Sequence, residues 1–416
     1  MLRVCRSGKL SSLNSQELTS LHRDLEHRFS RTIACLTEWS SLNTYSLQAD
    51  AILSFVHKIK KDYDYLYDEA DLITPPSLKE FQLNGQFSEL QCGPFLHLKK
   101  RSHLSKRVLL CIHSDTVFSP ENPFQSIQNQ IDNTWLNGPG VADAKGGLFL
   151  ALESLAAFEK LASSQDIGWD FLLVSDEEIG SPASSDLTRS LAKNASLGLV
   201  FEPALPHGNL VSSRPGSWVF NVHAKGKAAH AGRELEKGEN AITALIYLLK
   251  LLDEERANIG GQMNIGLIQG GTVVNQVPDS AVCQINIRAE TRHSLQSAQK
   301  KVRQLVNSLC VKEKVIFDLH TQCLRPPKEV SPACLSYYKH YKKIAKEFGI
   351  PINWEASFGV SDANFMADEG LPTLDTLGPI GRCLHSSDEA AFLPSFLDRS
   401  KILCCLLNDF AKGVIT

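Results

Sequence analysis

Three short apolar runs constrain the fold of this chain most strongly. They span residues 108–112, 171–174 and 197–201, and each is followed at once by acidic or histidine residues. Continuous apolar runs of this length are typical of strands buried on both faces of a mainly parallel sheet. In open α/β sheets, ligands bind beyond the carboxyl ends of the strands. We therefore predict an α/β domain whose chemistry lies at one edge of its sheet.

A second domain is predicted from about residue 217. The pattern there is a strand (218–224), a helix (240–252), two strands (263–268 and 281–288), a helix (295–310) and a strand (315–319). This βαββαβ order is that of a ferredoxin-like unit. Turn-rich stretches at 212–216 and 324–327 would be its hinges. A chain of 416 residues exceeds the size of a single core. We therefore predict one domain of residues 1–213 and 326–416 and an inserted domain of residues 214–325.

The composition disfavours several classes of partner and location. The formal net charge of -3 provides no basic field for binding nucleic acid. No window approaches the roughly 18 uninterrupted apolar residues that span a bilayer, and the first fifty residues, which read as helix, lack the apolar core of a signal peptide. The eleven cysteines form an odd set without a Cys-x-x-Cys pair, which suits a reducing compartment. We expect a cytoplasmic protein without a membrane or nucleic-acid partner.

The first candidate site residue is His113, at the end of the first apolar run, with Asp115 two positions later. A ligating imidazole usually donates its other N–H to a carboxylate, which fixes its tautomer and orientation. Asp115 suits that role. A lone histidine at a strand end is more often structural, so this motif does not establish a site by itself.

A glycine-rich turn over residues 138–147 places Asp143 just ahead of an apolar helix over 148–158. One interpretation of Asp143 is a simple helix cap. The spacing lacks the Gly-x-x-x-x-Gly-Lys-Ser/Thr pattern, which argues against a phosphate-binding loop. A metal-ligating carboxylate is the other interpretation.

Three consecutive carboxylates, Asp176, Glu177 and Glu178, follow the second apolar run. Their charges repel one another, and a bound cation would relieve that repulsion. The alternative interpretation is a solvated acidic turn. Zinc accepts histidine and carboxylate ligands, and a hydrolytic site also needs one unligated carboxylate as a base. Glu202 and His385 supply the remaining donors. The whole set matches a co-catalytic pair of metals with one glutamate to spare.

These motifs together resemble a known family, the zinc-dependent exopeptidases and deacylases. The family includes glutamate carboxypeptidase, aminoacylase, acetylornithine deacetylase and succinyl-diaminopimelate desuccinylase. The resemblance covers residues from about 106 to about 389 in the same motif order, and it looks most like the bacterial glutamate carboxypeptidase branch. It implies a mainly parallel-sheet, di-zinc catalytic domain with an inserted lid and dimerisation domain. It also implies two zinc ions per subunit, with cobalt or manganese as alternatives.

The resemblance assigns roles residue by residue. It places one histidine and one glutamate on each metal and one aspartate between the metals: His113 and Glu202, Glu178 and His385, and Asp143. Glu177 becomes the general base. The peptide bond between Asp143 and Ala144 is expected to be cis.

The resemblance also places residues of the inserted domain at the site. His230 resembles a family histidine that reaches into the site of a partner subunit and assists the oxyanion, which implies a homodimer. Asn275, Arg288 and Gly359 occupy substrate-contacting places, and Arg325 looks like a second substrate-binding arginine. Guanidinium groups bind carboxylates bidentately, so a substrate with a free carboxylate is expected. A surface role for His230 and a hinge role for Arg325 stay open.

We therefore expect a metal-dependent hydrolase that cleaves an amide or peptide bond next to a free carboxylate and releases a C-terminal amino acid. Water activated by two metals and Glu177 would attack the scissile carbonyl. A deacylase of N-acyl amino acids or a dipeptidase is the alternative within the same fold. A non-catalytic metal-containing binding module is the alternative from another class. Structural calcium conflicts with the two histidines, because calcium prefers oxygen ligands.

Overall fold

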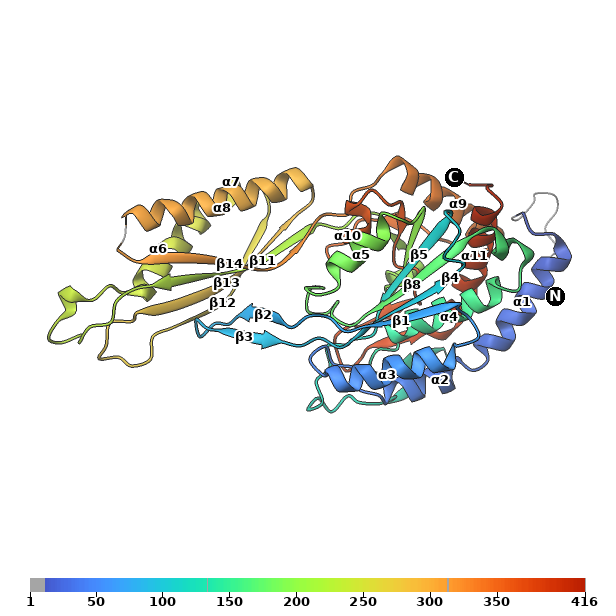
Figure 1. Cartoon of the computed structure of the whole chain (residues 1–416), viewed down its shortest axis with the longest axis horizontal. Coiled ribbons are helices and arrows are strands. Elements are labelled where there is room, and N and C mark those ends of the chain that lie inside the picture. The colour runs from blue at the N-terminus through green and yellow to red at the C-terminus, as the bar shows by residue number, and fades with distance from the viewer. Residues whose placement is uncertain (1–11, 133, 313, 416) are drawn as a thin grey trace.

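The computed structural model describes residues 12–132, 134–312 and 314–415. Two bodies lie end to end along the long axis of the molecule (Figure 1). The described parts of both chain ends belong to one body, and the middle of the chain forms the other (Figure 1). We call them the catalytic body and the lid. Their boundaries at 213/214 and 325/326 stay a prediction.

The catalytic body is built on a six-stranded sheet in which the three predicted strands are neighbours. Its order is β1-β4-β8-β5-β9-β16. The strands from β8 to β16 run parallel, whereas β1 and β4 pair antiparallel. The bounds are β1 (Glu69–Ile73), β4 (Phe95–Lys100), β8 (Gly168–Val174), β5 (Arg107–His113), β9 (Leu197–Val200) and β16 (Thr373–Leu374). The predicted α/β class and the three strands are confirmed.

Both faces of this sheet are buried, which explains the continuous apolar runs. Along β5, Leu110 belongs to the large core on one face, whereas Leu109 and Cys111 belong to a smaller core on the other. The large core is covered by α1 (Ser15–Phe29), α2 (Thr32–Ser40), α3 (Ala49–Asp62), α4 (Lys145–Phe158), α9 (Pro332–Glu347) and α11 (Leu393–Ala411). The smaller core is covered by α5 (Ser185–Ala192) and α10 (Ala363–Asp368). Strands need no polar face when helices cover both sides.

The N-terminal helices are held to α4 by a buried carboxylate. The side chain of Glu153 is fully buried. It accepts hydrogen bonds from Tyr63 Oη at 2.7 Å and from Arg28 Nη1 at 3.1 Å, and it also pairs with Arg31. Breaking such a buried pair leaves an uncompensated charge, so these contacts specify where the helices dock. Helix was predicted over the first fifty residues; residues 1–11 lie outside the described ones.

The lid is a four-stranded antiparallel sheet in the predicted βαββαβ order. The sheet order is β12-β13-β11-β14. The elements are β11 (Gly216–Lys225), α6 (Ala241–Glu254), α7 (Arg256–Ile259), β12 (Gln262–Gly270), β13 (Ser280–Ala289), α8 (Arg292–Lys312) and β14 (Ile316–Arg325). A core of its own fills the space between the sheet and α6 and α8. Strand β14 extends to Arg325, six residues beyond the predicted end at 319, because Ser217 pairs with Arg325.

A hairpin that the sequence analysis did not predict reaches from the catalytic body along the lid (Figure 1). It consists of β2 (Leu78–Phe81) and β3 (Phe87–Leu90). The Phe81 ring stacks on His320 of the lid with ring centroids 4.1 Å apart. Asn221 Nδ2 donates to the Phe81 carbonyl at 3.1 Å. The lid is therefore held at the hinges and also by this hairpin.

Two small sheets complete the described fold. One has the order β17-β18-β7-β6, with β17 (Gly381–Arg382), β18 (Ala390–Phe392), β7 (Trp135–Asn137) and β6 (Asn129–Ile131). The other pairs β10 (Leu210–Val211) with β15 (Trp354–Glu355). The thiols of Cys92, Cys111, Cys283 and Cys334 are buried and form no disulfide. In the described parts of the chain, no helix has the length and apolarity to cross a bilayer. The cytoplasmic location stays a prediction.

Candidate active site

The five proposed metal ligands come from the ends of strands and from two loops, and the structure brings them together. His113 ends β5, and Glu178 and Glu202 lie just beyond β8 and β9. Asp143 precedes α4, and His385 lies in the loop between β17 and β18. Strands β8, β5 and β9 are parallel neighbours, so their carboxyl ends meet at one edge of the sheet. We call this cluster of five residues the metal edge.

Asp143 lies between the two histidines of the metal edge. Its Oδ1 is 3.1 Å from Nε2 of His113, and its Oδ2 is 3.3 Å from Nε2 of His385. His113 Nε2 lies 3.8 Å from Oε1 of Glu202, and His385 Nε2 lies 3.2 Å from Oε2 of Glu178. The cluster thus divides into two histidine–glutamate pairs with one shared carboxylate.

The donor chemistry of this cluster fits a divalent transition metal. Ligand atoms of His113, Asp143 and Glu178 all lie within 4.8 Å of one another. Imidazole nitrogens and carboxylate oxygens are the donors that zinc takes in hydrolytic sites. Calcium, which takes only oxygen donors, fits this mixture poorly. The residues present can therefore hold the metal that the resemblance implies.

The acidity of the same groups shows an excess of buried negative charge. Burial, and then the charge of Asp143, raises the pKa of Glu178 to about 7. Burial also raises the pKa of Glu202 well above its usual range. Hydrogen bonds to Asp143 and Glu178 raise the pKa of His385 to about 11. A cation bound among these groups would favour the ionised carboxylates and the neutral imidazoles that metal ligation requires.

Asp115 lies beside the second ring nitrogen of His113 and also holds the acidic turn. Nδ1 of His113 is 3.0 Å from the backbone carbonyl oxygen of Asp115 and 3.4 Å from its carboxylate. The Asp115 carboxylate also accepts from the backbone N–H groups of Glu177 and Glu178 at 3.3 and 3.1 Å, and from Ser46 Oγ at 2.7 Å. Asp115 therefore contacts the imidazole of His113 and fixes the acidic turn.

The turn that carries Asp143 has an unusual backbone. The peptide bond between Asp143 and Ala144 is cis, which confirms the prediction. Gly140 has a φ of +72°, a conformation that side chains other than glycine rarely adopt. The buried amine of Lys145 donates to the backbone carbonyls of Trp39 and Leu42 at 3.0 and 2.7 Å. Contacts from α2 and the loop after it therefore anchor the turn on one side.

Arg325 does not lie where a substrate-binding arginine was predicted. It is 1% exposed, and its Nη1 donates to Oε1 of Glu177 at 2.7 Å. Its Nη2 donates to the Glu177 carbonyl at 2.9 Å and to Ser181 Oγ at 2.8 Å. Because β14 extends to this residue, the guanidinium meets the proposed base and not the lid pocket. Arg325 therefore contacts Glu177 directly.

Asp176, the first of the three consecutive carboxylates, points away from the metal edge. Its Oδ2 accepts from the backbone N–H groups of Ala183 and Ser184 at 2.7 and 3.0 Å. Burial raises its pKa to about 7. The repulsion inferred from the sequence is therefore relieved in part by turning one carboxylate toward the start of α5.

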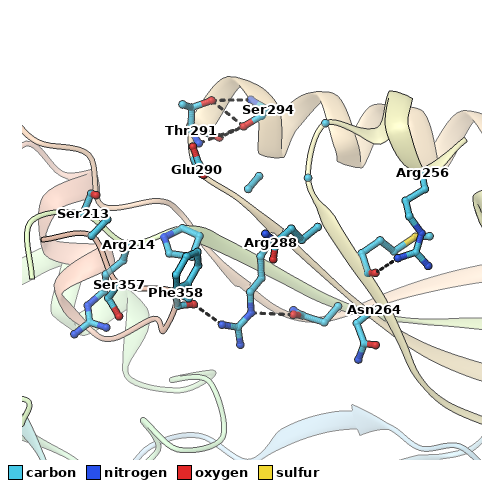
Figure 2. Close-up of a pocket in the computed structure, with 18 residues that line it drawn as sticks. Ser213, Arg214, Arg256, Asn264, Arg288, Glu290, Thr291, Ser294, Ser357 and Phe358 are labelled. Carbon is cyan, nitrogen blue, oxygen red and sulfur yellow. Dashed lines mark hydrogen bonds between the residues drawn. The ribbon is translucent and has the colours of Figure 1, made fainter. Parts of the chain in front are cut away.

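A cavity of about 1180 Å³ lies where the lid meets the catalytic body. Figure 2 shows Arg288 of β13 in this cavity, facing the loop that carries Phe358. Its guanidinium donates to the Phe358 carbonyl and, through Nε, to Asn286 Oδ1 at 3.2 Å. The Phe358 side chain is 78% exposed. The neighbouring Gly359 carbonyl accepts from Nη1 of Arg214 at 3.1 Å. Arg288 and Phe358 thus line one cavity, and Gly359 directly follows Phe358 in the chain.

His230 and Asn275 lie far from the metal edge of the same chain. They belong to the loops after β11 and β12, at the end of the lid that points away from the catalytic body (Figure 1). Both side chains are exposed. The two loops meet in an isolated bridge between His230 and Gln276, and Ala231 N–H donates to the Asn275 carbonyl at 3.0 Å. We call these two loops the lid tip.

The sequence analysis did not single out two residues that support the site. Glu389 is fully buried and accepts hydrogen bonds from the turn that carries Asp143. Asp362 is 2% exposed, accepts from Ser181 Oγ at 2.5 Å and lies 3.8 Å from Arg325 Nη1. Glu389 and Asp362 each contact residues far away in the sequence, so no local pattern indicated these contacts.

Comparison with known proteins supports the family resemblance. Residues 212–314 match the family model described as the peptidase dimerisation domain. Carboxypeptidase G2 of Pseudomonas sp. (strain RS-16) is 27% identical over 299 residues, which is 69% of each chain. The lid thus matches a peptidase domain, and the chain is similar to M20 peptidases along most of its length. It is therefore a hydrolase of the metallopeptidase class.

Solved structures of M20-like enzymes share the fold. The M20 family metallo-carboxypeptidase Sso-CP2 from Sulfolobus solfataricus aligns with a TM-score of 0.69 at 14% identity, covering 92% of this chain and 99% of that one. The dipeptidase Dug1p from Saccharomyces cerevisiae aligns with a TM-score of 0.71 at 14% identity, covering 96% of this chain and 100% of that one. At such identities the likeness shows the fold alone.

Proposed function

We propose that this M20 metallopeptidase is a two-zinc enzyme that cleaves an amide or peptide bond next to a free carboxylate and releases a C-terminal amino acid. The observation that carries the proposal is the position of Asp143, which lies within 3.3 Å of both histidines. A single carboxylate shared by two histidine–glutamate pairs suits a pair of adjacent metals. Cobalt or manganese could replace zinc in the same donor set.

The chain's own residues would divide the chemical work. When bound, the two metals would lower the pKa of a water molecule and polarise the scissile carbonyl. Glu177 would take the proton of that water and give it to the leaving amine. Arg325 would hold Glu177 in place through its hydrogen bond to Oε1. Asp115 would fix the backbone of the same turn.

We propose that the substrate carboxylate binds to Arg288. Arg288 donates through Nε and Nη1 to protein oxygens, and its Nη2 meets no acceptor among the described residues. A guanidinium held in this way is positioned to bind a carboxylate in the cavity. Gly359 would border the bound substrate from the catalytic body, and the lid tip of a partner subunit would bring the partner's Asn275 to it. The name Carboxypeptidase G2 supports a carboxypeptidase, whereas the structural likeness to a dipeptidase keeps that alternative open.

We further propose that the enzyme works as a homodimer in which His230 serves the partner's site. The match to the dimerisation domain supports self-association. Strand β12 lies at the edge of the lid sheet, and Leu267, Ile268 and Val274 on it and just after it are 49%, 55% and 102% exposed. Unpaired edge strands with apolar side chains are ready to pair with another chain. A partner's lid tip could then supply the oxyanion donor that one chain lacks.

A substrate panel with and without zinc tests the proposed activity. We expect the zinc-loaded protein to hydrolyse peptides or N-acyl amino acids with a free carboxylate, and their carboxamides to react far more slowly. Preference for N-acetyl or N-succinyl amino acids over glutamyl peptides would identify the deacylase alternative. Preference for unblocked dipeptides would identify the dipeptidase. Tight zinc binding without turnover on any substrate would favour the non-catalytic binding module and contradict the proposal.

A further inference from the structure

Glu389 is a buried carboxylate to which the mechanism above assigns no work. It lies four residues after His385, just before β18, and its side chain is fully buried. Such a charge is costly to bury unless hydrogen bonds compensate for the lost water. The hydrogen-bond partners of Glu389 therefore indicate its structural role.

The partners of Glu389 are three backbone N–H groups of the turn that carries Asp143. Oε1 accepts from Ala142 and from Asp143, both at 3.0 Å, and Oε2 accepts from Gly140 at 3.2 Å. The positive φ of Gly140 helps to turn these donors toward one point. Burial, and then the charge of Asp143, raises the pKa of Glu389 to about 8, whereas these three N–H groups favour its ionised form.

Backbone contacts hold the same two segments together. The Glu389 carbonyl accepts from Gly138 N–H at 3.1 Å and from Asn137 Nδ2 at 2.8 Å. The strands that follow and precede these residues, β18 and β7, pair antiparallel. The segment with His385 and the turn with Asp143 are thus joined through both backbone and side chain.

We propose that Glu389 is a positioning residue that sets the Asp143 carboxylate against His385 and so determines the metal affinity of the site. The inference rests on the proposed function for the role of Asp143, but not on any substrate. The cradle holds the backbone of Asp143, and the rigid link to the His385 loop fixes the separation of two ligands that come from distant parts of the chain. Groups that orient metal ligands typically contribute about 10- to 100-fold to metal affinity.

The test is zinc titration of the apo-protein against a chromophoric chelator. Glu389→Gln keeps the shape of the side chain but points an amide N–H₂ at one or more backbone donors, so at least one hydrogen bond is lost. We expect zinc affinity to fall by about 10- to 100-fold with the fold retained in circular dichroism. The matched control is Asp388→Asn, which neutralises the exposed neighbouring carboxylate and should leave the affinity unchanged.

A second variant and a second readout keep the test decisive. If Glu389→Gln does not fold, Glu389→Asp is measured instead, because it keeps the charge and only shortens the reach. At saturating zinc, a positioning role also predicts a lower kcat with little change in KM. Unchanged zinc affinity in a folded Glu389 variant would overturn the proposal. Weakened zinc binding in a protein that hydrolyses none of the panel substrates would support this inference while rejecting the proposed activity.

Discussion

The metal edge and the lid tip carry the proposed chemistry in opposite ways. At the metal edge, His113 and Asp143 are buried, and the five side chains contact one another within a single chain. At the lid tip, His230 and Asn275 are exposed, and their loops lie at the end of the lid that points away from the catalytic body (Figure 1). The metal edge is thus assembled within one chain, whereas the lid tip lies far from the metal edge of its own chain.

This difference separates two requirements for activity. The metal edge depends on the folding of the catalytic body, because strands β5, β8 and β9 bring its ligands to one place. The lid tip depends on contact with another copy. Substitutions at the metal edge should therefore change the metal content and the rate of the chemical step. Substitutions at the lid tip should change the activity that depends on contact between subunits.

The largest expected effect follows from Glu177→Ala. Loss of the general base should lower kcat by about 100- to 10,000-fold. The bound zinc should stay near the wild-type amount, because Glu177 is not among the five proposed ligands. Steady-state kinetics and elemental analysis measure both quantities, with Asp186→Ala, an exposed carboxylate on α5, as control. Loss of metal with intact activity would reverse the roles assigned to Glu177 and Glu178.

His230→Ala should have the next largest effect. Removing an oxyanion donor costs about 100- to 1,000-fold in kcat. Zinc content should not change, because no residue of the lid tip belongs to the metal edge. Arg233→Ala, an exposed residue of the same loop, is the matched control. Near-normal kcat for His230→Ala would remove the lid tip from catalysis.

Arg288→Ala should act on substrate binding. Hydrogen bonds to charged groups contribute about 1.5–3 kcal/mol, so KM should rise by about 10- to 100-fold with a smaller change in kcat. Arg288→Lys keeps the charge but loses the planar fork, and should restore only part of the binding. Equal KM values for carboxylate and carboxamide substrates in the wild-type enzyme would refute this role.

The smallest effect concerns the hairpin that holds the lid. Burial lowers the pKa values of His223 and His320, and Lys225 lowers them further, although Asp318 opposes the shift. Below about pH 6.5 the unfolded chain then binds more protons than the folded one, so acid favours unfolding. When the pH falls from 7 to 5.5, the unfolding temperature of His320→Phe should drop by about 1–2 °C less than that of the wild type. An equal loss in both proteins would show that this imidazole does not titrate on unfolding.

Much of the fold followed from local sequence patterns. Continuous apolar runs predicted the strands β5, β8 and β9, because both faces of their sheet are covered. The alternation of strands and helices predicted the lid. The hairpin of β2 and β3 was missed because its strands have only four residues each and because Phe81 packs on His320, which lies far along the chain.

The site was predictable where the chemistry of a residue is local. Histidines and carboxylates directly after buried strands indicated the metal edge. Arg325 and Glu389 were misjudged or missed because their partners lie far away in sequence: Glu177 is 148 positions from Arg325, and Asp143 is 246 positions from Glu389. Only the folded chain shows that Arg325 contacts the proposed base and that Glu389 supports the turn with Asp143.

Subunit complementation tests the central claim, that the metal edge acts within its own chain while the lid tip acts on a partner. The inactive variants Glu177→Ala and His230→Ala would be dissociated, mixed in equal amounts and reassociated. In each mixed dimer, one site would combine an intact Glu177 with an intact His230. Random pairing therefore predicts recovery of about a quarter of wild-type activity. Activity no higher than that of the separate variants, with mixed dimers demonstrated by mass spectrometry, would contradict the account.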